Sequence, residues 1–397
     1  MSIHLSWSQP KVGRFALFYL GFRPFFLLAS LAAVTLGVLW LLYWAQLITL
    51  ETAWPSPVTW HGHEMVFGFG MAVIAGFLLT AIRNWTSLQT LHRWPLAVLA
   101  GLWLSARLLN FIPHMHIPAA IADLLFGVGL ALALTHPILK AKQWKQIGLI
   151  SKVWLLVVAN AVSYAQPLHA QTWTLLGLLI IVAILLTMIH RVVPFFIEKA
   201  IQINRKQRIT LPRLPVVQWL NLPLFLAFTA VWLLWPAHWL QTVLAWTLAA
   251  TNGYVLLKWI HLEVFKAPLL WSLWGGYAFI VLGLLLAGFA NIASVSWLAV
   301  HAFGAGAMGL TTLGMMMRVT LGHTGRNVFQ PGALAAGVLS MVLIAAVIRV
   351  FGSLGLFSSQ LHALYLFSLI FWSLGFGLFL IAYLKYWLTP RIDGLYG

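Results

Sequence analysis

Cysteine is absent from this chain of 397 residues, and charged side chains are scarce. Without cysteine the chain itself provides no disulfide framework, no thiolate metal site and no iron–sulfur cluster. Asp, Glu, Lys and Arg make up only 7% of the residues, whereas a soluble globular protein has about 25%. So few charges cannot cover a water-facing surface, and we therefore expect lipid to surround most of the chain.

Long hydrophobic runs take the place of the missing charges, and 62% of the residues are hydrophobic. Runs of roughly 20 apolar residues span a bilayer as helices. The sequence therefore predicts an all-α integral membrane protein with about twelve transmembrane helices. The predicted segments are 16–45, 60–82, 94–111, 117–139, 151–165, 172–197, 215–235, 238–259, 269–290, 296–318, 333–351 and 361–388. The first run is too long for the apolar core of a signal peptide, so we expect no cleavable signal.

The positions of the basic residues predict the orientation of these helices. The net charge of +17 comes from 23 Lys and Arg against 6 Asp and Glu, and Lys and Arg occur in every second connection, from Lys11 before the first helix to Arg391 after the last. Only Arg107 and Arg349 depart from this alternation. Because basic loops stay in the cytoplasm, we expect cytoplasmic N- and C-termini and an inner-membrane location. The partner implied is membrane lipid and not nucleic acid, and protein partners are left open.

The chain reads as one polytopic membrane domain over residues 1–397. Its longest loop lies between the sixth and seventh predicted helices and is rich in Lys and Arg. This loop divides the chain into halves 1–198 and 215–397, joined on the cytoplasmic side. We find no convincing sequence repeat between the two halves.

Ionisable side chains at membrane depth are costly and usually functional. Arg107, near the end of the third predicted helix, and Asp123, near the start of the fourth, reach similar depth because the turn between them is short. A structural salt bridge is the simpler interpretation of this pair. Glu64 and Arg349 have no evident partner in the sequence.

Histidine is common, with 14 copies, and the predicted topology sorts these residues by depth. His61, His63 and His301 fall near the periplasmic face, and His190 and His323 fall near the cytoplasmic face. On a regular helix, His61 and His63 would point about 200° apart. Only an extended segment would turn both toward one metal ion. The alternative is that they anchor the membrane interface beside Trp60.

A stripe of the tenth predicted helix carries His301, Ala305, Met308, Thr312 and Met315. Imidazole and the soft thioether of Met together suit copper, and imidazole alone suits haem iron. A packing seam of small residues explains Ala305 equally well.

Arginine accompanies histidine near the cytoplasmic face. Arg191 follows His190, and Arg318 and Arg326 flank His323. A guanidinium beside a buried imidazole suits a haem propionate or a phosphate. It equally suits an ordinary anchor that binds lipid headgroups.

Several strings of the sequence, in order, resemble the NnrS family. They are GFRPFF at 21–26, WHGHEM at 60–65, AGFLLTA at 75–81, NWT at 84–86, HRVVPFF at 190–196 and MRVTLGHTGR at 317–326. The family commonly has Gly after Asn-Trp-Thr, where this chain has Ser87. The last two predicted helices contribute little to the resemblance.

The resemblance implies a haem- and copper-containing bacterial inner-membrane protein of the nitric oxide response and of tolerance to nitrosative stress. Nitric oxide becomes the candidate ligand. The residues we expect to bind the haem are His63, His190, His301, His323, Arg191, Arg318 and Arg326. The residues we expect to bind a metal ion are His61, His63, His301, Met65 and Met308. Haem is the stronger expectation and copper the weaker one.

Other functions stay open at this stage. Twelve helices with a central cytoplasmic loop are also typical of secondary transporters, here of metal or haem. An assembly subunit of a respiratory complex is a third interpretation. The chain lacks the cysteines of a haem-c attachment motif and the adjacent paired histidines expected of a haem–copper oxidase. Whether it is an enzyme is therefore left open.

Overall fold

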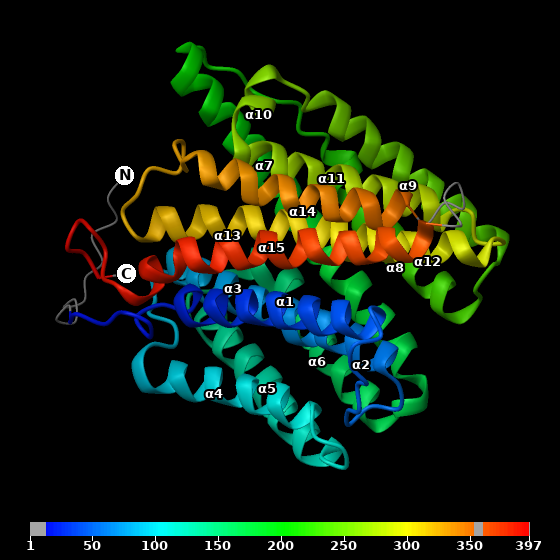
Figure 1. Cartoon of the computed structure of the whole chain (residues 1–397). Helices are drawn as coiled ribbons and strands as arrows, with labels where there is room; N and C mark the ends of the chain where they lie inside the picture. The colour runs from blue at the N-terminus through cyan, green and yellow to red at the C-terminus, as the bar shows by residue number, and fades with distance from the viewer. Residues whose placement is uncertain (1–12, 353–359, 397) are drawn as a thin grey trace.

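The computed structural model describes residues 13–352 and 360–396, and within that part of the chain all regular structure is helical (Figure 1). Lys11 lies outside the described residues. The first half contains α1 (Phe22–Trp44), α2 (Pro57–His63), η1 (Glu64–Gly70), α3 (Met71–Thr86), α4 (Arg93–Asn110), α5 (His116–Lys140), η2 (Trp144–Gln146), α6 (Ile147–Ala165), η3 (Pro167–His169) and α7 (Ala170–Arg205). The second half contains α8 (Pro215–Leu234), α9 (Trp239–Lys258), α10 (Leu262–Lys266), α11 (Pro268–Ala287), α12 (Ala293–His301), η4 (Ala302–Met308), α13 (Gly309–His323), α14 (Ala333–Phe351) and α15 (Leu361–Leu388).

The predicted all-α membrane fold is confirmed for the described residues. Each of the twelve predicted segments falls on a helix or on a run of consecutive helices. Within residues 13–352 and 360–396, nine such segments are long and apolar enough to cross a membrane. The segments that fall outside that count are α4, α8 and α9. The protein is thus a multi-pass membrane protein, and contact with lipid follows from its apolar helices.

Two predicted helix ends differ from the observed ones for identifiable reasons. The predicted segment 172–197 ends too early, because α7 continues to Arg205 through polar residues that lie beyond an apolar run. At 36 residues, α7 is about 54 Å long, which exceeds a hydrocarbon core of about 30 Å. The predicted segment 60–82 also ends too early, because α3 continues to Thr86. Ser87, at the position where the family commonly has glycine, ends this helix with a φ of 56°. This left-handed conformation explains why glycine suits the site.

The first and last helices pack against each other, so segments far apart in the sequence close the helical body (Figure 1). Trp372 on α15 donates its indole N–H to the backbone oxygen of Ala33 on α1, at 3.1 Å. Arg23, fully buried at the start of α1, donates Nη1 to three carbonyl oxygens at the end of α15. A helix leaves its last carbonyls without intrahelical donors, so this guanidinium stabilises that end.

The described ends of the chain also meet. The rings of Tyr19 and Tyr396 stack with their centroids 4.7 Å apart. Tyr19 precedes α1 and Tyr396 follows α15, so both lie on one side of the helical body. A chain that crosses the membrane an even number of times has both of its ends on the same side.

Candidate functional site

Two π-helical segments follow directly after histidines that the sequence singled out. His63 is the last residue of α2, and η1 begins at Glu64. His301 is the last residue of α12, and η4 begins at Ala302. A π-helical turn widens the backbone and is frequent at functional sites. Both segments are rich in glycine, which lets neighbouring side chains approach the backbone closely.

The segment that carries His61 and His63 is a regular helix and not an extended strand. Ser56 caps it by accepting a hydrogen bond from the backbone N–H of Thr59 at 3.1 Å, and Pro57 occupies the first position. Both features favour a helix start. The two histidine rings consequently have separate surroundings, and the geometry that would direct both to one metal ion is not adopted.

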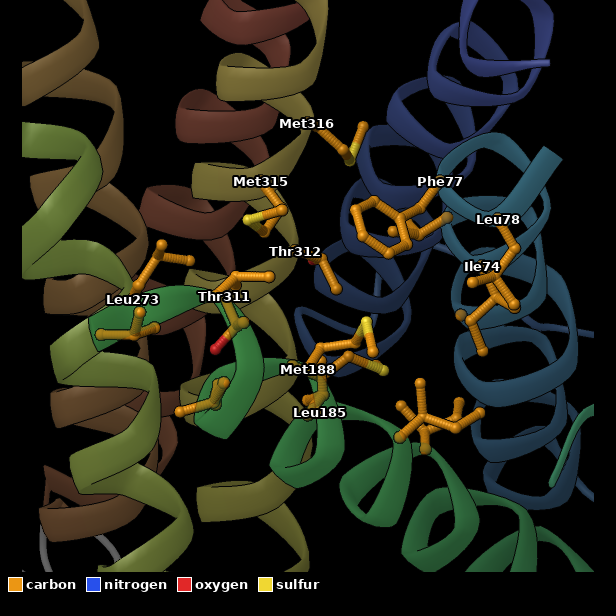
Figure 2. A pocket seen from close by; sticks show the side chains of 18 of the residues that line it. Ile74, Phe77, Leu78, Leu185, Met188, Leu273, Thr311, Thr312, Met315 and Met316 are labelled. Carbon is orange, nitrogen blue, oxygen red and sulfur yellow. The ribbon is translucent and has the colours of Figure 1, made fainter. Parts of the chain in front are cut away.

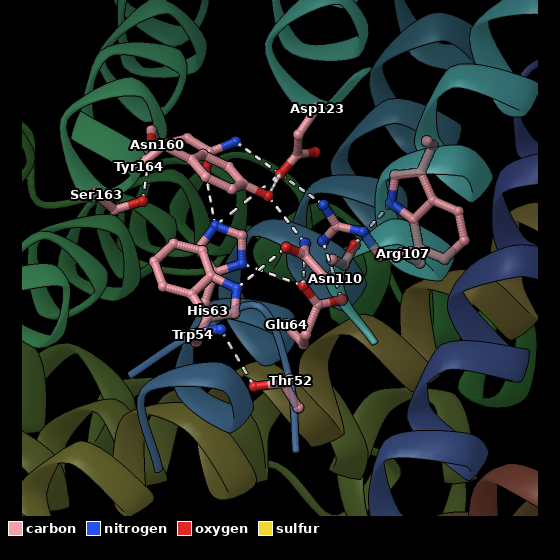
Figure 3. Close-up of polar contacts among 12 residues, drawn as sticks. Thr52, Trp54, His63, Glu64, Arg107, Asn110, Asp123, Asn160, Ser163 and Tyr164 are labelled. Carbon is pink, nitrogen blue, oxygen red and sulfur yellow. Dashed lines mark hydrogen bonds and ion pairs between the residues drawn. The ribbon is translucent and has the colours of Figure 1, made fainter. Parts of the chain in front are cut away.

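His63 enters a buried network of charged groups (Figure 3). Its Nδ1 lies 3.1 Å from Oε1 of Glu64, and its Nε2 lies 2.8 Å from Oδ1 of Asn160. Arg107 lies between two carboxylates, with Nη1 3.3 Å from Oε2 of Glu64 and Nη2 2.5 Å from Oδ2 of Asp123. The predicted pair of Arg107 and Asp123 is confirmed, and Arg107 is the partner that the sequence did not reveal for Glu64.

Amide and hydroxyl groups complete this network. Asn110 donates Nδ2 to Glu64 at 3.0 Å, and Asn160 donates Nδ2 to Asp123 at 3.0 Å. Tyr164 donates its hydroxyl to Asp123 at 3.2 Å. The side chains of these residues come from η1, α4, α5 and α6, so four segments are joined by polar contacts inside an apolar body.

The hydrogen-bond directions define the charge of the network. Asn160 donates to Asp123, so its oxygen faces His63, and Nε2 of that ring must donate. Nδ1 faces an oxygen of Glu64, so one proton lies between these two atoms. With that proton and the guanidinium of Arg107, the two carboxylates are neutralised. This balance matters because an uncompensated charge in the membrane is expensive.

Gly68 allows the guanidinium to approach the π-helical segment. A Cβ at this position would lie 2.8 Å from Nη1 of Arg107 and 3.2 Å from Oε2 of Glu64. Trp103 donates its indole N–H to the backbone oxygen of Gly68 at 3.1 Å. The role of Gly68 is therefore to allow close packing of Arg107 and Trp103 against the helix backbone.

His61 and His301 form a second group on another side of α2. The His61 ring stacks on Trp40 with centroids 4.2 Å apart and planes at 5°. His301 donates Nδ1–H to the backbone oxygen of Trp297 at 2.9 Å, and Nη2 of Arg349 donates to its Nε2 at 2.9 Å. His61 and Arg349 both lie within electrostatic range of the His301 ring. Arg349, which had no evident partner in the sequence, thus pairs with a predicted ligand.

The ring nitrogens of this second group suit metal ligation. Nδ1 of His61 is buried and accepts no hydrogen bond from the described residues. Nε2 of His301 carries a lone pair that accepts from Nη2 of Arg349, so a metal ion would have to replace this hydrogen bond. Haem iron takes one or two such nitrogens, often from different helices. The pair of His61 and His301 therefore fits haem ligation by its donor chemistry.

His190 lies in a third polar group and does not join His323. Its Nε2 is 2.9 Å from the Tyr277 hydroxyl and 3.4 Å from Oδ1 of Asn252. Asn252 and Asn221 exchange hydrogen bonds at 2.9 Å. Asn221, Asn252 and Tyr277 come from α8, α9 and α11, respectively. The sequence did not reveal them, because a single polar residue in an apolar run gives no periodic signal.

The predicted arginines contact aromatic rings and backbone instead of one shared centre. Arg191 donates to Oε1 of Gln146 at 2.7 Å and lies over Trp85. Arg318 lies over the Phe196 ring at 3.6 Å, and Arg326 lies over the Tyr386 ring at 3.9 Å. His323 contacts the ring of Phe22 on α1. The expected cytoplasmic set is thus distributed over several helices.

The predicted methionine ligands also separate from the histidines. Met308 is buried and lines an apolar cavity with Thr312 and Met315, so this part of the stripe stays together. His301 is not among the residues that line the cavity, because the π-helical segment η4 intervenes and shifts the helical register. Met65 packs at the junction of two apolar clusters.

No cluster of three or more His, Asp or Glu side chains in the described part of the chain forms a metal-binding group. A copper ion held by the predicted set His61, His63, His301, Met65 and Met308 would need these residues to converge. His63 and Met308 instead have the separate surroundings described above. Any ligation of copper by the predicted set therefore depends on His61, His301 and Met65, which packs against the cluster that contains Trp40.

Together these features define a multi-pass helical membrane protein with imidazole, carboxylate and guanidinium groups buried inside its helical body. The chain belongs to the NnrS family, because the family model described as NnrS protein matches residues 16–391. The resemblance predicted from the sequence is thereby confirmed. Family membership supports a role in the nitric oxide response at the level of the family. No curated protein matches the chain.

Proposed function

We propose that this chain is a haem-binding protein of the bacterial inner membrane that acts in the nitric oxide response and in tolerance of nitrosative stress. The observation that carries the proposal is the pair of half-buried imidazoles, His61 and His301, which come from different helical segments and each have a ring nitrogen with a lone pair. Membership of the NnrS family gives the biological setting.

In this proposal His61 and His301 would hold the haem iron, and Arg349, once released from Nε2 of His301, would pair with a propionate. The haem would supply a redox centre, and nitric oxide would bind the iron in exchange for one of the two imidazoles. The chain provides the setting: Trp40 orients the His61 ring by stacking, and the Trp297 carbonyl sets the tautomer of His301. A carbonyl oxygen that accepts from the other ring nitrogen also raises the basicity of a ligating imidazole. Copper, the weaker expectation, would use the same two imidazoles.

The His63 network has a different role in this proposal. Both ring nitrogens of His63 face acceptor oxygens, so the ring is engaged before any metal arrives. The network holds one proton between His63 and Glu64 inside the helical body. A protein that handles charge at a buried redox centre benefits from a nearby group that stores a proton.

The first test is the optical spectrum of the purified protein, reduced minus oxidised, before and after nitric oxide, with iron and copper analysis. We expect a haem spectrum that nitric oxide shifts. His61→Ala and His301→Ala should lose haem, because each removes an imidazole that would hold the iron. The matched control is His169→Ala, which removes an exposed histidine and should retain the haem.

Other variants test the assignment of the ligands. His190→Ala or His323→Ala that loses haem, while His301→Ala keeps it, would move the haem to another group of histidines. A colourless wild-type protein made with sufficient haem would contradict the haem proposal. For the biological role, a deletion strain should regain tolerance of a nitric oxide donor with the wild-type gene and not with His301→Ala.

A further inference from the structure

An apolar cavity lies between α3, α7, α11 and α13, apart from every polar group described above (Figure 2). Its volume is about 60 Å³, roughly the share of two water molecules in the liquid. Four methionines contribute to its wall, namely Met188, Met308, Met315 and Met316.

The wall of this cavity suits an apolar guest and does not suit water. Its only polar side chains are Thr311 and Thr312, and the buried hydroxyl of Thr311, which has no hydrogen-bond partner among the described residues, is a single polar group. Thr312 already donates its hydroxyl to the backbone oxygen of Gly309 at 3.4 Å. A buried water needs two to four polar partners, and a cavity without them stays dry and binds apolar molecules such as xenon. Thioether sulfur is polarizable, which favours contact with a polarizable guest.

The cavity has a route of access from the membrane. Phe77 on α3, Val192 on α7 and Met315 on α13 are half-buried, whereas the deeper lining residues Met308 and Met316 are buried. These three half-buried side chains come from three of the four helices that frame the cavity. An apolar gas dissolves better in hydrocarbon than in water, so the guest would arrive from the lipid.

We propose that this cavity binds one small apolar gas molecule. Its identification as nitric oxide rests on the function proposed above, since nitric oxide is a nearly apolar diatomic that concentrates in membranes. A volume of about 60 Å³ is too small for a haem. The cavity would then hold the gas within the same helical body as the buried imidazoles.

The test uses the full chain in lipid nanodiscs with ¹³C-methyl methionine and xenon as the probe. The chain has ten methionines, so each methyl signal reports on one place. We expect xenon pressure to cause saturable shifts of the Met188, Met308, Met315 and Met316 signals. The Met65 and Met341 signals serve as internal controls and should not shift.

Variants that fill the cavity should abolish the saturable shift. Thr312→Leu fills it from α13, and Val73→Leu fills it from α3, so the second variant covers a failure of the first to fold. Thr247→Leu, a matched change at an exposed position of α9, should leave the shift intact. Equal shifts of all methionine signals, or none, would overturn the proposal, because xenon would then only dissolve in the lipid.

Nitric oxide provides the second arm of the experiment. It is paramagnetic, so binding should broaden the same four signals that xenon shifts. Xenon binding without this broadening would overturn nitric oxide as the guest. Loss of the haem from purified protein would contradict the function proposed above and would leave the xenon result unaffected, so the two failures are distinguishable.

Discussion

At the scale of single residues, the guanidinium of Arg107 decides whether two carboxylates can remain inside the membrane. It contacts Glu64 and Asp123 and is itself buried. Removing one partner from a buried charge pair costs about 3–5 kcal/mol, because the other charge is left uncompensated. We expect Arg107→Gln to lower the free energy of unfolding by about this amount, measured by denaturant unfolding of the protein in detergent micelles.

Arg213→Gln is the matched control for this prediction. Its guanidinium pairs with Glu198 at 3.3 Å while its side chain is 56% exposed. An exposed ion pair contributes about 0–1 kcal/mol. Equal losses in the two variants would show that the buried network does not behave as an ion pair.

Glu263 provides a residue-scale prediction of pH dependence outside the membrane-spanning segments. Its carboxylate accepts from Nδ2 of Asn204 at 2.8 Å and from Nε of Arg205 at 3.1 Å, and these hydrogen bonds lower its pKa from 4.5 to about 2. A depressed carboxyl pKa stabilises the folded state above the unfolded pKa, and that contribution is lost as the pH falls. The loss should occur between pH 4.5 and pH 2.

Glu263→Gln should remove this part of the acid dependence. The measurement is the unfolding midpoint of both proteins from neutral pH down to pH 2. We expect the difference between them to be largest at neutral pH and to shrink through the stated window. A difference that stays constant with pH would contradict the assignment to this carboxylate.

At the scale of elements, the two π-helical segments position the candidate groups. In η1, the glycine at position 68 lets Arg107 lie against the backbone. We expect Gly68→Ala to displace the guanidinium and to destabilise the protein by about 1–3 kcal/mol, as overpacking does in a close-packed core. Thermal unfolding measures the loss.

Gly101→Ala is the matched control on α4. A Cβ at this helical glycine would meet nothing within 4 Å. Alanine favours a helix over glycine by about 0.8–1 kcal/mol, so this variant should be neutral or slightly stabilised. A similar loss in both variants would contradict the proposed contact at position 68.

At the scale of the whole molecule, contact between the ends of the chain supports an even number of membrane crossings. Tyr19 stacks on Tyr396, and α1 packs along α15. We propose twelve crossings with both termini in the cytoplasm, because twelve helical segments or runs of consecutive helices and the alternating basic loops agree with this topology. The nine clearly apolar segments alone would place the ends on opposite sides.

The absence of cysteine makes this topology easy to test. Single cysteines at Gln207, in the basic loop after α7, and at Leu168, in η3, occupy exposed positions. A membrane-impermeant maleimide should label Leu168→Cys in spheroplasts and should label Gln207→Cys only after lysis. The reverse pattern would contradict cytoplasmic termini, and labelling of both in spheroplasts would contradict the crossing between them.

The sequence alone determined the helical membrane class, the approximate helix positions and the family. These properties follow from local composition, since an apolar run of sufficient length must be helical in lipid whatever its neighbours are. It also indicated the pair of Arg107 and Asp123, because a short turn joins the two helices that carry them. The sequence did not determine the helix ends at positions 87 and 205, because helix capping depends on single residues.

Only the tertiary structure decided which buried groups meet. The sequence placed His61, His63 and His301 at one depth, but rotation about a helix axis separates His63 from the other two. Glu64, Asn110, Asn160 and Tyr164 come together from three segments, and no local pattern encodes that convergence. The reason is physical: depth in the membrane follows from position along one helix, whereas the direction in which a side chain points and the groups it meets follow from packing between helices.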